Sequence, residues 1–248
     1  MTWFDRLALA LAAAGLLSMP IFAVIARRRP RDAEVASRPT TVLLGAWVRE
    51  WLMWAISPVV GACVRWRISP LVFNLAGVLF GAAAGVAYAR GAFTAGGWLV
   101  LLGGLADVFD GRIARARNLV SDAGAFIDST LDRFAESFAF AGLAMRFADS
   151  PWAELVVSLA LGGSLLVSYT RARGEGLGVR FRGGLMQRAE RLVSLAVASL
   201  LDPVVCAAAG WPSGRLVLVA IGAIAAGSLG TACYRTWTIA RALDERAR

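Results

Sequence analysis

Long apolar runs, separated by clusters of arginine, restrict the fold of this chain more than any other feature. Six of them cover residues 69–89, 93–114, 120–145, 152–170, 189–210 and 216–237, and a further run covers 7–26. Most approach the ~20 residues that an α-helix needs to cross the hydrocarbon layer. Since a segment inside lipid must satisfy its own backbone hydrogen bonds, helices are the expected structure. We therefore predict an all-α, polytopic membrane bundle of six core transmembrane helices.

The first apolar run is predicted to be an N-terminal anchor helix, added to the six core helices. It is followed at once by an arginine block, Arg27, Arg28, Arg29 and Arg31. A secretory signal peptide, the alternative, carries its positive charge before the apolar core and small residues at a cleavage site. Because the arginines here follow the core, an uncleaved anchor with an outside N-terminus is favoured. Residues 1–40 are thus assigned to an anchor and a basic linker.

Residues 41–67 are predicted to form an interfacial juxtamembrane helix. Trp47, Trp51 and Trp54 recur at helical spacing, and arginines flank the segment on both sides. Tryptophan favours the membrane–water interface, and a crossing segment would place one basic cluster on the outside. The rest of the chain divides into a six-helix domain at 68–240 and a short cytoplasmic tail at 241–248.

The distribution of arginine predicts which ends of the helices face the cytoplasm. All 26 basic residues are arginine, and 21 of them fall on one side of the predicted topology. That excess marks this side as cytoplasmic. The net charge of +9 is then explained by contact with anionic membrane lipids, and no nucleic-acid partner is expected. We expect an integral protein of a bacterial plasma membrane.

Two further features of the spans bear on helix packing. Gly77, Gly81 and Gly85 recur at four-residue spacing, which permits close contact between neighbouring helices. Pro203 follows Asp202 inside the fifth core run, where proline is expected to break or kink a helix.

Four aspartates lie where the second core helix ends and the third begins: Asp107, Asp110, Asp128 and Asp132. Each would cost about 2.5–3.5 kcal/mol at the centre of a bilayer, so cations are expected to compensate them. The first two share a helix face at i, i+3, and the last two share another at i, i+4. Convergent carboxylates suit hard cations such as Mg²⁺ or Mn²⁺. The sequence therefore predicts a metal site near the cytoplasmic face.

The residues around the aspartates favour chemistry on a phosphate group. Gly111 and Gly124 leave room for a ligand to approach the backbone, and Arg115 is placed to bind a phosphate. Because the chain has no histidine and no lysine, a general base is expected to be a carboxylate. The alternatives are aspartate–arginine pairs that only close a helix end, an ion transporter with buried acidic residues, and an intramembrane prenyltransferase.

The spacing of these residues resembles the signature of the CDP-alcohol phosphotransferases, D-x2-D-G-x2-A-R-x8-G-x3-D-x3-D. The chain matches it throughout, at Asp107, Asp110, Gly111, Ala114, Arg115, Gly124, Asp128 and Asp132. The resemblance implies that a CDP-linked lipid, such as CDP-diacylglycerol, donates its phosphatidyl-type group to a small alcohol and releases CMP. It also implies two divalent metal ions, Mg²⁺ or Mn²⁺, and a homodimer.

The same resemblance implies roles for individual residues. Asp107, Asp110 and Asp128 would be metal ligands. Asp132 would complete the metal site and would also deprotonate the acceptor hydroxyl. The residues that would bind the CDP donor are Asp107, Gly111, Ala114, Arg115 and Gly124.

The acceptor is predicted from arginines around the connection between the fourth and fifth core helices: Arg171, Arg173, Arg188 and Arg191. Arginine binds phosphate in a bidentate manner, which favours a phosphorylated acceptor; anchoring to lipid headgroups is the alternative. The segment resembles the branch that contains the phosphatidylinositol-phosphate synthases, which implies inositol phosphate as acceptor. Arg171, Gly174 and Ala189 depart from that branch. Glycerol 3-phosphate and an unphosphorylated alcohol therefore stay open as acceptors.

Overall fold

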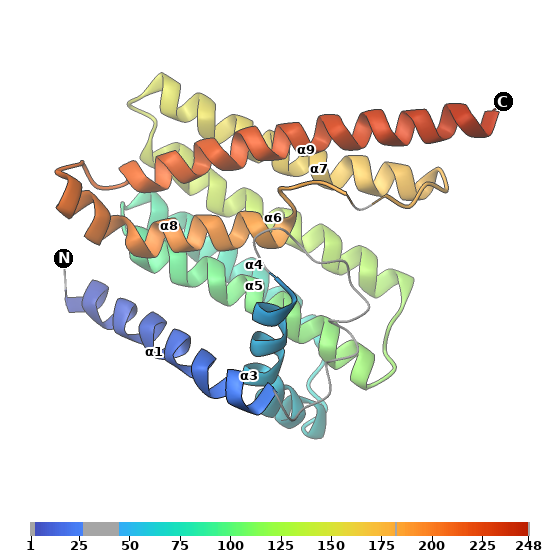
Figure 1. The fold of residues 1–248 in the computed structure, drawn as a ribbon, viewed down its shortest axis with the longest axis horizontal. Coiled ribbons are helices and arrows are strands. Elements are labelled where there is room, and N and C mark those ends of the chain that lie inside the picture. The colour runs from blue at the N-terminus through green and yellow to red at the C-terminus, as the bar shows by residue number, and fades with distance from the viewer. Residues whose placement is uncertain (1–2, 27–44, 182, 248) are drawn as a thin grey trace.

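A computed structural model describes residues 3–26, 45–181 and 183–247 of the protein. This part of the chain is all-α, without strands (Figure 1). Its long helices are α1 (Trp3–Ala26), α3 (Ala46–Arg65), α4 (Pro70–Ala89), α5 (Phe93–Ala116), α6 (Asp122–Arg146), α7 (Pro151–Gly176), α8 (Arg188–Ala209) and α9 (Arg215–Ala247). The predicted basic linker and the first residues of the predicted 41–67 segment lie outside the described residues.

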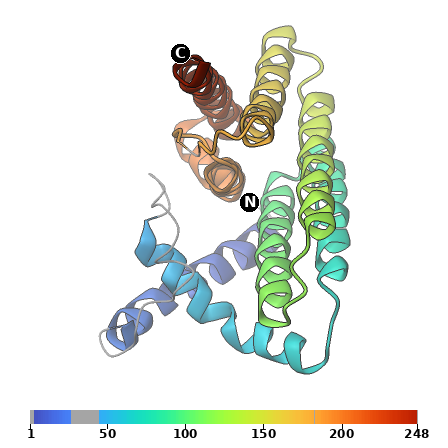
Figure 2. The same ribbon diagram turned by 90° about the vertical axis from the view of Figure 1, so that its right-hand side faces the viewer.

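The helices α4 to α9 form the core bundle, in two groups joined by α8. α4 packs against α5 and α6, and α7 packs against α9. α8 contacts both α5 and α9, so it lies between the two groups, as Figure 2 shows. Within the described chain, six helices are long and apolar enough to cross a membrane: α1, α4, α5, α7, α8 and α9. The prediction of an all-α polytopic membrane bundle is confirmed.

The third core helix, α6, is not one of these six apolar helices of the described chain, although its 25 residues are long enough to cross a membrane. The reason is its polar content. Asp128, Asp132, Arg133 and Glu136 all lie within its first four turns. Asp132 and Glu136 line the cavity, and Asp128 joins the aspartates of α5. The polar content of α6 thus comes largely from the site residues that it carries.

Pro203 does not end the fifth core helix, because α8 continues from Arg188 to Ala209 with the proline inside it. The buried Asp202 instead caps the start of α9. Its carboxylate accepts hydrogen bonds from the backbone nitrogens of Gly214 at 2.8 Å and Leu216 at 3.1 Å. Backbone N–H groups at a helix start have no partner within the helix, and a carboxylate there also complements the helix dipole. Asp202 therefore joins α8 to α9.

The tryptophans of α3 pack against the N-terminal helix. Phe22 of α1 is 3% exposed and lies with its ring centroid 5.8 Å from that of Trp47 and 5.6 Å from that of Trp54. Trp51 Nε1 donates to Ser18 Oγ at 2.8 Å. The tryptophan face predicted to meet the bilayer interface is thus used to dock α1. An interfacial position for α3 itself stays a prediction.

The opposite side of α3 supports the helix that carries the first two aspartates. Ile56 and Cys63 of α3 form one apolar cluster with Phe109 and Ile113 of α5. Phe109 stacks on Phe73 of α4, with ring centroids 5.4 Å apart. Since Phe109 lies between Asp107 and Asp110 in sequence, this packing fixes the direction in which α5 presents its carboxylates.

Glycines let α4 and α6 approach each other closely. A Cβ atom on Gly81 would lie 2.5 Å from the carbonyl oxygen of Ala135, and one on Gly142 would overlap the carbonyl group of Gly85. Packing of this kind replaces the hydrophobic effect as the attraction between helices in lipid. The packing role predicted for Gly81 and Gly85 is confirmed. At Gly77 the contact is looser, since a Cβ would find its nearest atom 3.8 Å away.

The contact between α4 and α6 yields a stability prediction. Gly142→Ala should destabilise the protein by about 1–3 kcal/mol, because the methyl group must displace the backbone of α4. The matched control is Gly162→Ala in α7, where an added Cβ meets nothing within 4 Å. Thermal unfolding of both variants in detergent micelles measures the difference. Equal melting temperatures would contradict the close contact.

Candidate active site

Three of the four predicted metal ligands converge where α5 and α6 meet. Asp107, Asp110 and Asp128 each offer a carboxylate oxygen, and these oxygens lie within 4.8 Å of one another. Asp110 is buried, and the other two are half-buried. Oxygen donors at this separation suit a hard divalent cation. The cluster could hold a metal ion, as the sequence predicted.

A residue of α4 completes this cluster. The side-chain amide of Asn74 lies against the carboxylates, and with its nitrogen turned toward them it would donate to Asp110 Oδ2 at 2.8 Å and to Asp128 Oδ1 at 3.0 Å. Asn74 thereby bridges an aspartate of α5 and one of α6. The sequence analysis missed it, because a single asparagine in an apolar run carries no spacing signal. Its one hint is its polarity in the first two turns of a membrane helix.

Asp132 lies one turn beyond Asp128 on the same face of α6 and forms an ion pair across the bundle. Its Oδ2 atom lies 2.6 Å from Nη1 of Arg188, the first residue of α8. Both side chains are partly exposed, at 17% for Asp132 and 27% for Arg188. The candidate base and a candidate acceptor-binding arginine therefore contact each other directly.

A second, deeper ion pair continues the same face of α6. Arg191 of α8 donates through Nε to Glu136 Oε1 at 2.9 Å and through Nη2 to Glu136 Oε2 at 3.3 Å. Both side chains are buried, at 2% and 5% exposure. Glu136 is a site residue that the sequence analysis missed. Its position four residues after Asp132 extends the i, i+4 spacing and could have revealed it.

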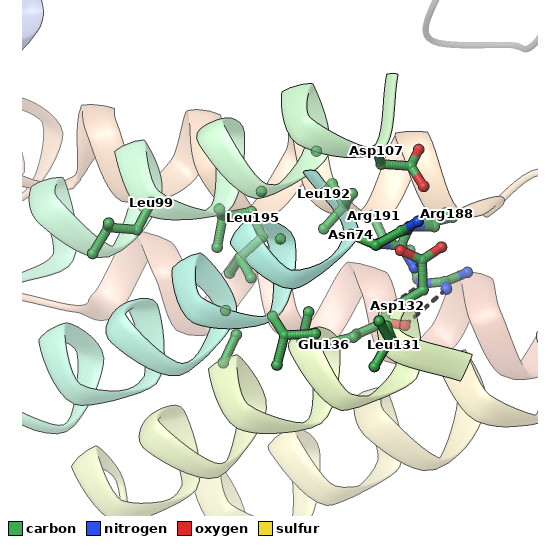
Figure 3. A pocket seen from close by; sticks show the side chains of 18 of the residues that line it. Asn74, Leu99, Asp107, Leu131, Asp132, Glu136, Arg188, Arg191, Leu192 and Leu195 are labelled. Carbon is green, nitrogen blue, oxygen red and sulfur yellow. Dashed lines mark hydrogen bonds and ion pairs between the residues drawn. The ribbon is translucent and has the colours of Figure 1, made fainter. Parts of the chain in front are cut away.

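These residues line a cavity among α4, α5, α6 and α8. Figure 3 shows Asp107, Asp132 and Arg188 at one end, and Leu99 and Leu195 toward the other. The further apolar lining residues are Val78, Val100, Leu131, Ala139, Phe140 and Leu192, of which Leu131 lies beside Asp132. The cavity is therefore amphipathic along its length. The apolar end belongs to the buried core of the bundle, so the charged end is the part of the cavity where a ligand headgroup can bind.

The predicted donor-binding residues lie in the second half of α5 and at the start of α6. Asp107 lines the cavity, while Gly111, Ala114 and Arg115 occupy the last turns of α5. Arg115 lies beside Gly111, since a Cβ on the glycine would be 3.1 Å from Arg115 Nη1. Gly124 lies in the first turn of α6, where its backbone nitrogen donates to Ser121 Oγ at 3.1 Å. Their roles in donor binding stay predictions.

The four predicted acceptor-binding arginines fall into two pairs. Arg188 and Arg191 line the cavity with the carboxylates. Arg171 and Arg173 are exposed in the last turns of α7, and Arg171 Nε donates to Glu175 at 3.1 Å. The structure thus places one pair against the aspartates and the other on the surface at the end of α7.

Comparison with known proteins agrees with this geometry. Residues 67–219 match the CDP-alcohol phosphatidyltransferase family. The phosphatidylinositol phosphate synthase of Streptomyces avermitilis is 35% identical over 216 residues, which cover 83% of this chain and 87% of that protein. The archaetidylinositol phosphate synthase of Methanothermobacter thermautotrophicus is 39% identical over 127 residues, 51% of this chain and 64% of that protein.

A solved structure extends the likeness to the fold. The crystal structure of the Mycobacterium tuberculosis phosphatidylinositol phosphate synthase with CDP-DAG bound matches with a TM-score of 0.65 and 26% identity. The match covers 73% of this chain and 92% of that one. The same enzyme has also been crystallised with manganese and citrate. With the signature aspartates gathered between α5 and α6, this chain belongs to the CDP-alcohol phosphatidyltransferase family of membrane-bound transferases.

Proposed function

We propose that this protein transfers the phosphatidyl-type group of a CDP-linked lipid, CDP-diacylglycerol in the first place, to a phosphorylated polyol such as inositol phosphate. The observation that carries the proposal is the carboxylate cluster, in which Asp107, Asp110 and Asp128 converge at one end of the cavity. Carboxylates grouped in this way can hold the cations that a donor diphosphate needs. The Mycobacterium tuberculosis enzyme, crystallised with CDP-DAG, supports this donor.

The cofactor is proposed to be two divalent metal ions, Mg²⁺ or Mn²⁺. Asp107, Asp110 and Asp128 would hold them, with Asp132 completing the set. Bound there, the ions would neutralise the donor diphosphate and stabilise the departing CMP. The manganese complex of the Mycobacterium tuberculosis enzyme is consistent with this choice of ion.

The residues of the chain supply the remaining chemistry. The acceptor hydroxyl oxygen attacks the phosphorus that carries the lipid, and the bond from that phosphorus to the CMP oxygen breaks. Asp132 takes the hydroxyl proton, since a carboxylate is the base at hand in a chain without histidine or lysine. The products are the new phospholipid and CMP.

A phosphorylated acceptor is supported by Arg188. Its Nε atom is buried and has no hydrogen-bond partner in the described structure, although its Nη1 contacts Asp132. An unpaired buried N–H of a guanidinium group is costly, and a phosphate oxygen would satisfy it. Arg191 lines the same part of the cavity, and Arg171 and Arg173 would attract an anionic acceptor from the end of α7. Glycerol 3-phosphate is the second candidate acceptor.

The cellular setting follows from the arginine distribution. We propose a bacterial plasma-membrane enzyme whose aspartates face the cytoplasm, where CDP-linked lipid and a soluble acceptor can both reach them. Membrane lipids surround the bundle, and a homodimer is expected from the family. A nucleic-acid partner is not part of the proposal.

The reaction class is tested by the Asp132→Asn variant. The amide has the size of the carboxylate but cannot accept the hydroxyl proton, so CMP release should fall by about 10²–10⁴-fold while the donor still binds. The measurement is CMP formation from CDP-diacylglycerol with Mg²⁺ or Mn²⁺ and a panel of acceptors: inositol phosphate, glycerol 3-phosphate, serine and free polyols.

The matched control for this test is Asp122→Asn. Asp122 is exposed at the first residue of α6, and its variant should keep wild-type turnover. Unchanged turnover in Asp132→Asn would remove the assignment of the base. Prenyl transfer, or ion flux without CMP, in the wild-type protein would overturn the proposed reaction itself.

The acceptor is tested by neutralising arginines one at a time. Arg188→Gln and Arg171→Gln should raise KM for inositol phosphate, by about 10- to 100-fold for Arg188 if a charge-assisted hydrogen bond is lost. KM for the CDP-linked lipid should change much less. Arg241→Gln is the control, because Arg241 is exposed on α9 and pairs with Glu245. Equal increases in both KM values in all three variants would favour a role in membrane anchoring.

A further inference from the structure

The backbone that leads into the site arginines is held by α9. The α7–α8 connection ends at Gln187, and Arg188 opens α8. Just before that point, the backbone nitrogen of Met186 donates to Thr231 Oγ1 at 3.1 Å. Arg235 Nε donates to the carbonyl oxygen of Gly183 at 2.8 Å. Two side chains of one helix thus bind two backbone groups of the segment that delivers Arg188.

These contacts come from a single face of α9. Gly227, Thr231 and Arg235 are spaced by four residues, so they lie above one another along the helix. A Cβ on Gly227 would lie 2.9 Å from Met186 Cε, so the methionine side chain packs on this glycine. At Gly184, with φ +127°, an added Cβ would overlap the side chain of Thr231. The face and the connection therefore fit each other closely.

Burying the charged side chain of Arg235 is energetically unfavourable, so packing alone does not explain this residue. It is 3% exposed, and a buried guanidinium in a membrane bundle is tolerated only when its N–H groups are bound. Here Nη1 donates to the Val167 carbonyl of α7 at 2.8 Å, in addition to the bond from Nε to Gly183. The residue therefore joins α9, α7 and the connection at one point.

The same segment is tied to the active-site ion pairs. The carbonyl oxygen of Met186 accepts from Arg191 Nη1 at 3.3 Å, and Arg191 holds Glu136 through its other nitrogens. Two residues after Met186, Arg188 contacts Asp132. A shift of Met186 would therefore move both arginines relative to the carboxylates of α6.

We propose that Thr231 and Arg235 are positioning residues for the acceptor site. They fix the end of the α7–α8 connection on α9, and this sets where Arg188 and Arg191 stand relative to Asp132 and Glu136. The inference rests on the proposed function, since it assigns these arginines to the phosphate of the acceptor. The donor contacts on α5 and the start of α6 do not pass through this face.

The test is a set of variants at Thr231. Thr231→Val keeps the shape but cannot accept the bond from Met186, whereas Thr231→Ser keeps the hydroxyl. Thr231→Val should raise KM for inositol phosphate about 3- to 10-fold, the effect of one lost hydrogen bond. KM for CDP-diacylglycerol should stay within about two-fold. Thr231→Ser should behave as wild type.

Two further variants complete the design. Thr238→Val is the control, because the Thr238 hydroxyl donates to the Tyr234 carbonyl of its own helix; its kinetics should match wild type. Arg235→Gln should act as Thr231→Val does and more strongly, and it provides the second reading should Thr231→Val be poorly folded. Size-exclusion elution and melting temperature in detergent identify folded variants.

The outcomes separate the two proposals. The positioning role would be overturned if Thr231→Val and Arg235→Gln raised both KM values together. It would also be overturned if neither variant changed KM for inositol phosphate. If none of the phosphorylated acceptors supports CMP release by the wild-type protein, the proposed acceptor class fails instead. That result would be seen before any variant is compared.

Discussion

The compensation of buried carboxylates is the constraint on which this structure depends. α6 carries Asp128, Asp132 and Glu136 on one face inside an apolar bundle, and each acidic group there has a different partner. Asp128 meets Asn74 and the aspartates of α5, Asp132 meets Arg188, and Glu136 meets Arg191. The first group is left rich in negative charge, which is the condition for metal binding. The other two are balanced by α8.

Burial increases along the site, from the aspartate cluster that can bind ions to the buried ion pair between Glu136 and Arg191. Glu136 and Arg191 are almost fully buried, and their two parallel hydrogen bonds give a defined geometry. Removing one partner of such a pair typically costs about 3–5 kcal/mol, because the other charge is left buried. Asp132 and Arg188, one turn nearer the start of α6, are more exposed. These two side chains are therefore accessible to the proposed substrates, while the inner pair links α6 to α8.

The sequence predicted the parts of this design that repeat or follow a pattern. Apolar runs marked the helices, and the signature spacing marked Asp107, Asp110 and Asp128, which the structure brings together. Asn74 was missed because its role exists only when α4 lies against both aspartate helices. The tryptophans of α3 were interpreted from their affinity for interfaces, yet they pack on Phe22 and Ser18 of α1. A spacing pattern within one helix, such as that of Gly81 and Gly85, can show that a face is packed, but it does not show which helix packs there.

The two cavity arginines differ in how far their hydrogen bonds are already used. Arg191 donates hydrogen bonds from Nε and Nη2 to Glu136 and from Nη1 to the Met186 carbonyl oxygen. Arg188 contacts Asp132 through Nη1, while its buried Nε has no partner among the described residues. An incoming phosphate would therefore gain more from Arg188 than from Arg191. Arg188 also contacts the proposed base, Asp132. An acceptor phosphate bound at Arg188 would therefore bring a hydroxyl of the same molecule close to the Asp132 carboxylate. This favours acceptors that carry both a phosphate and a hydroxyl group.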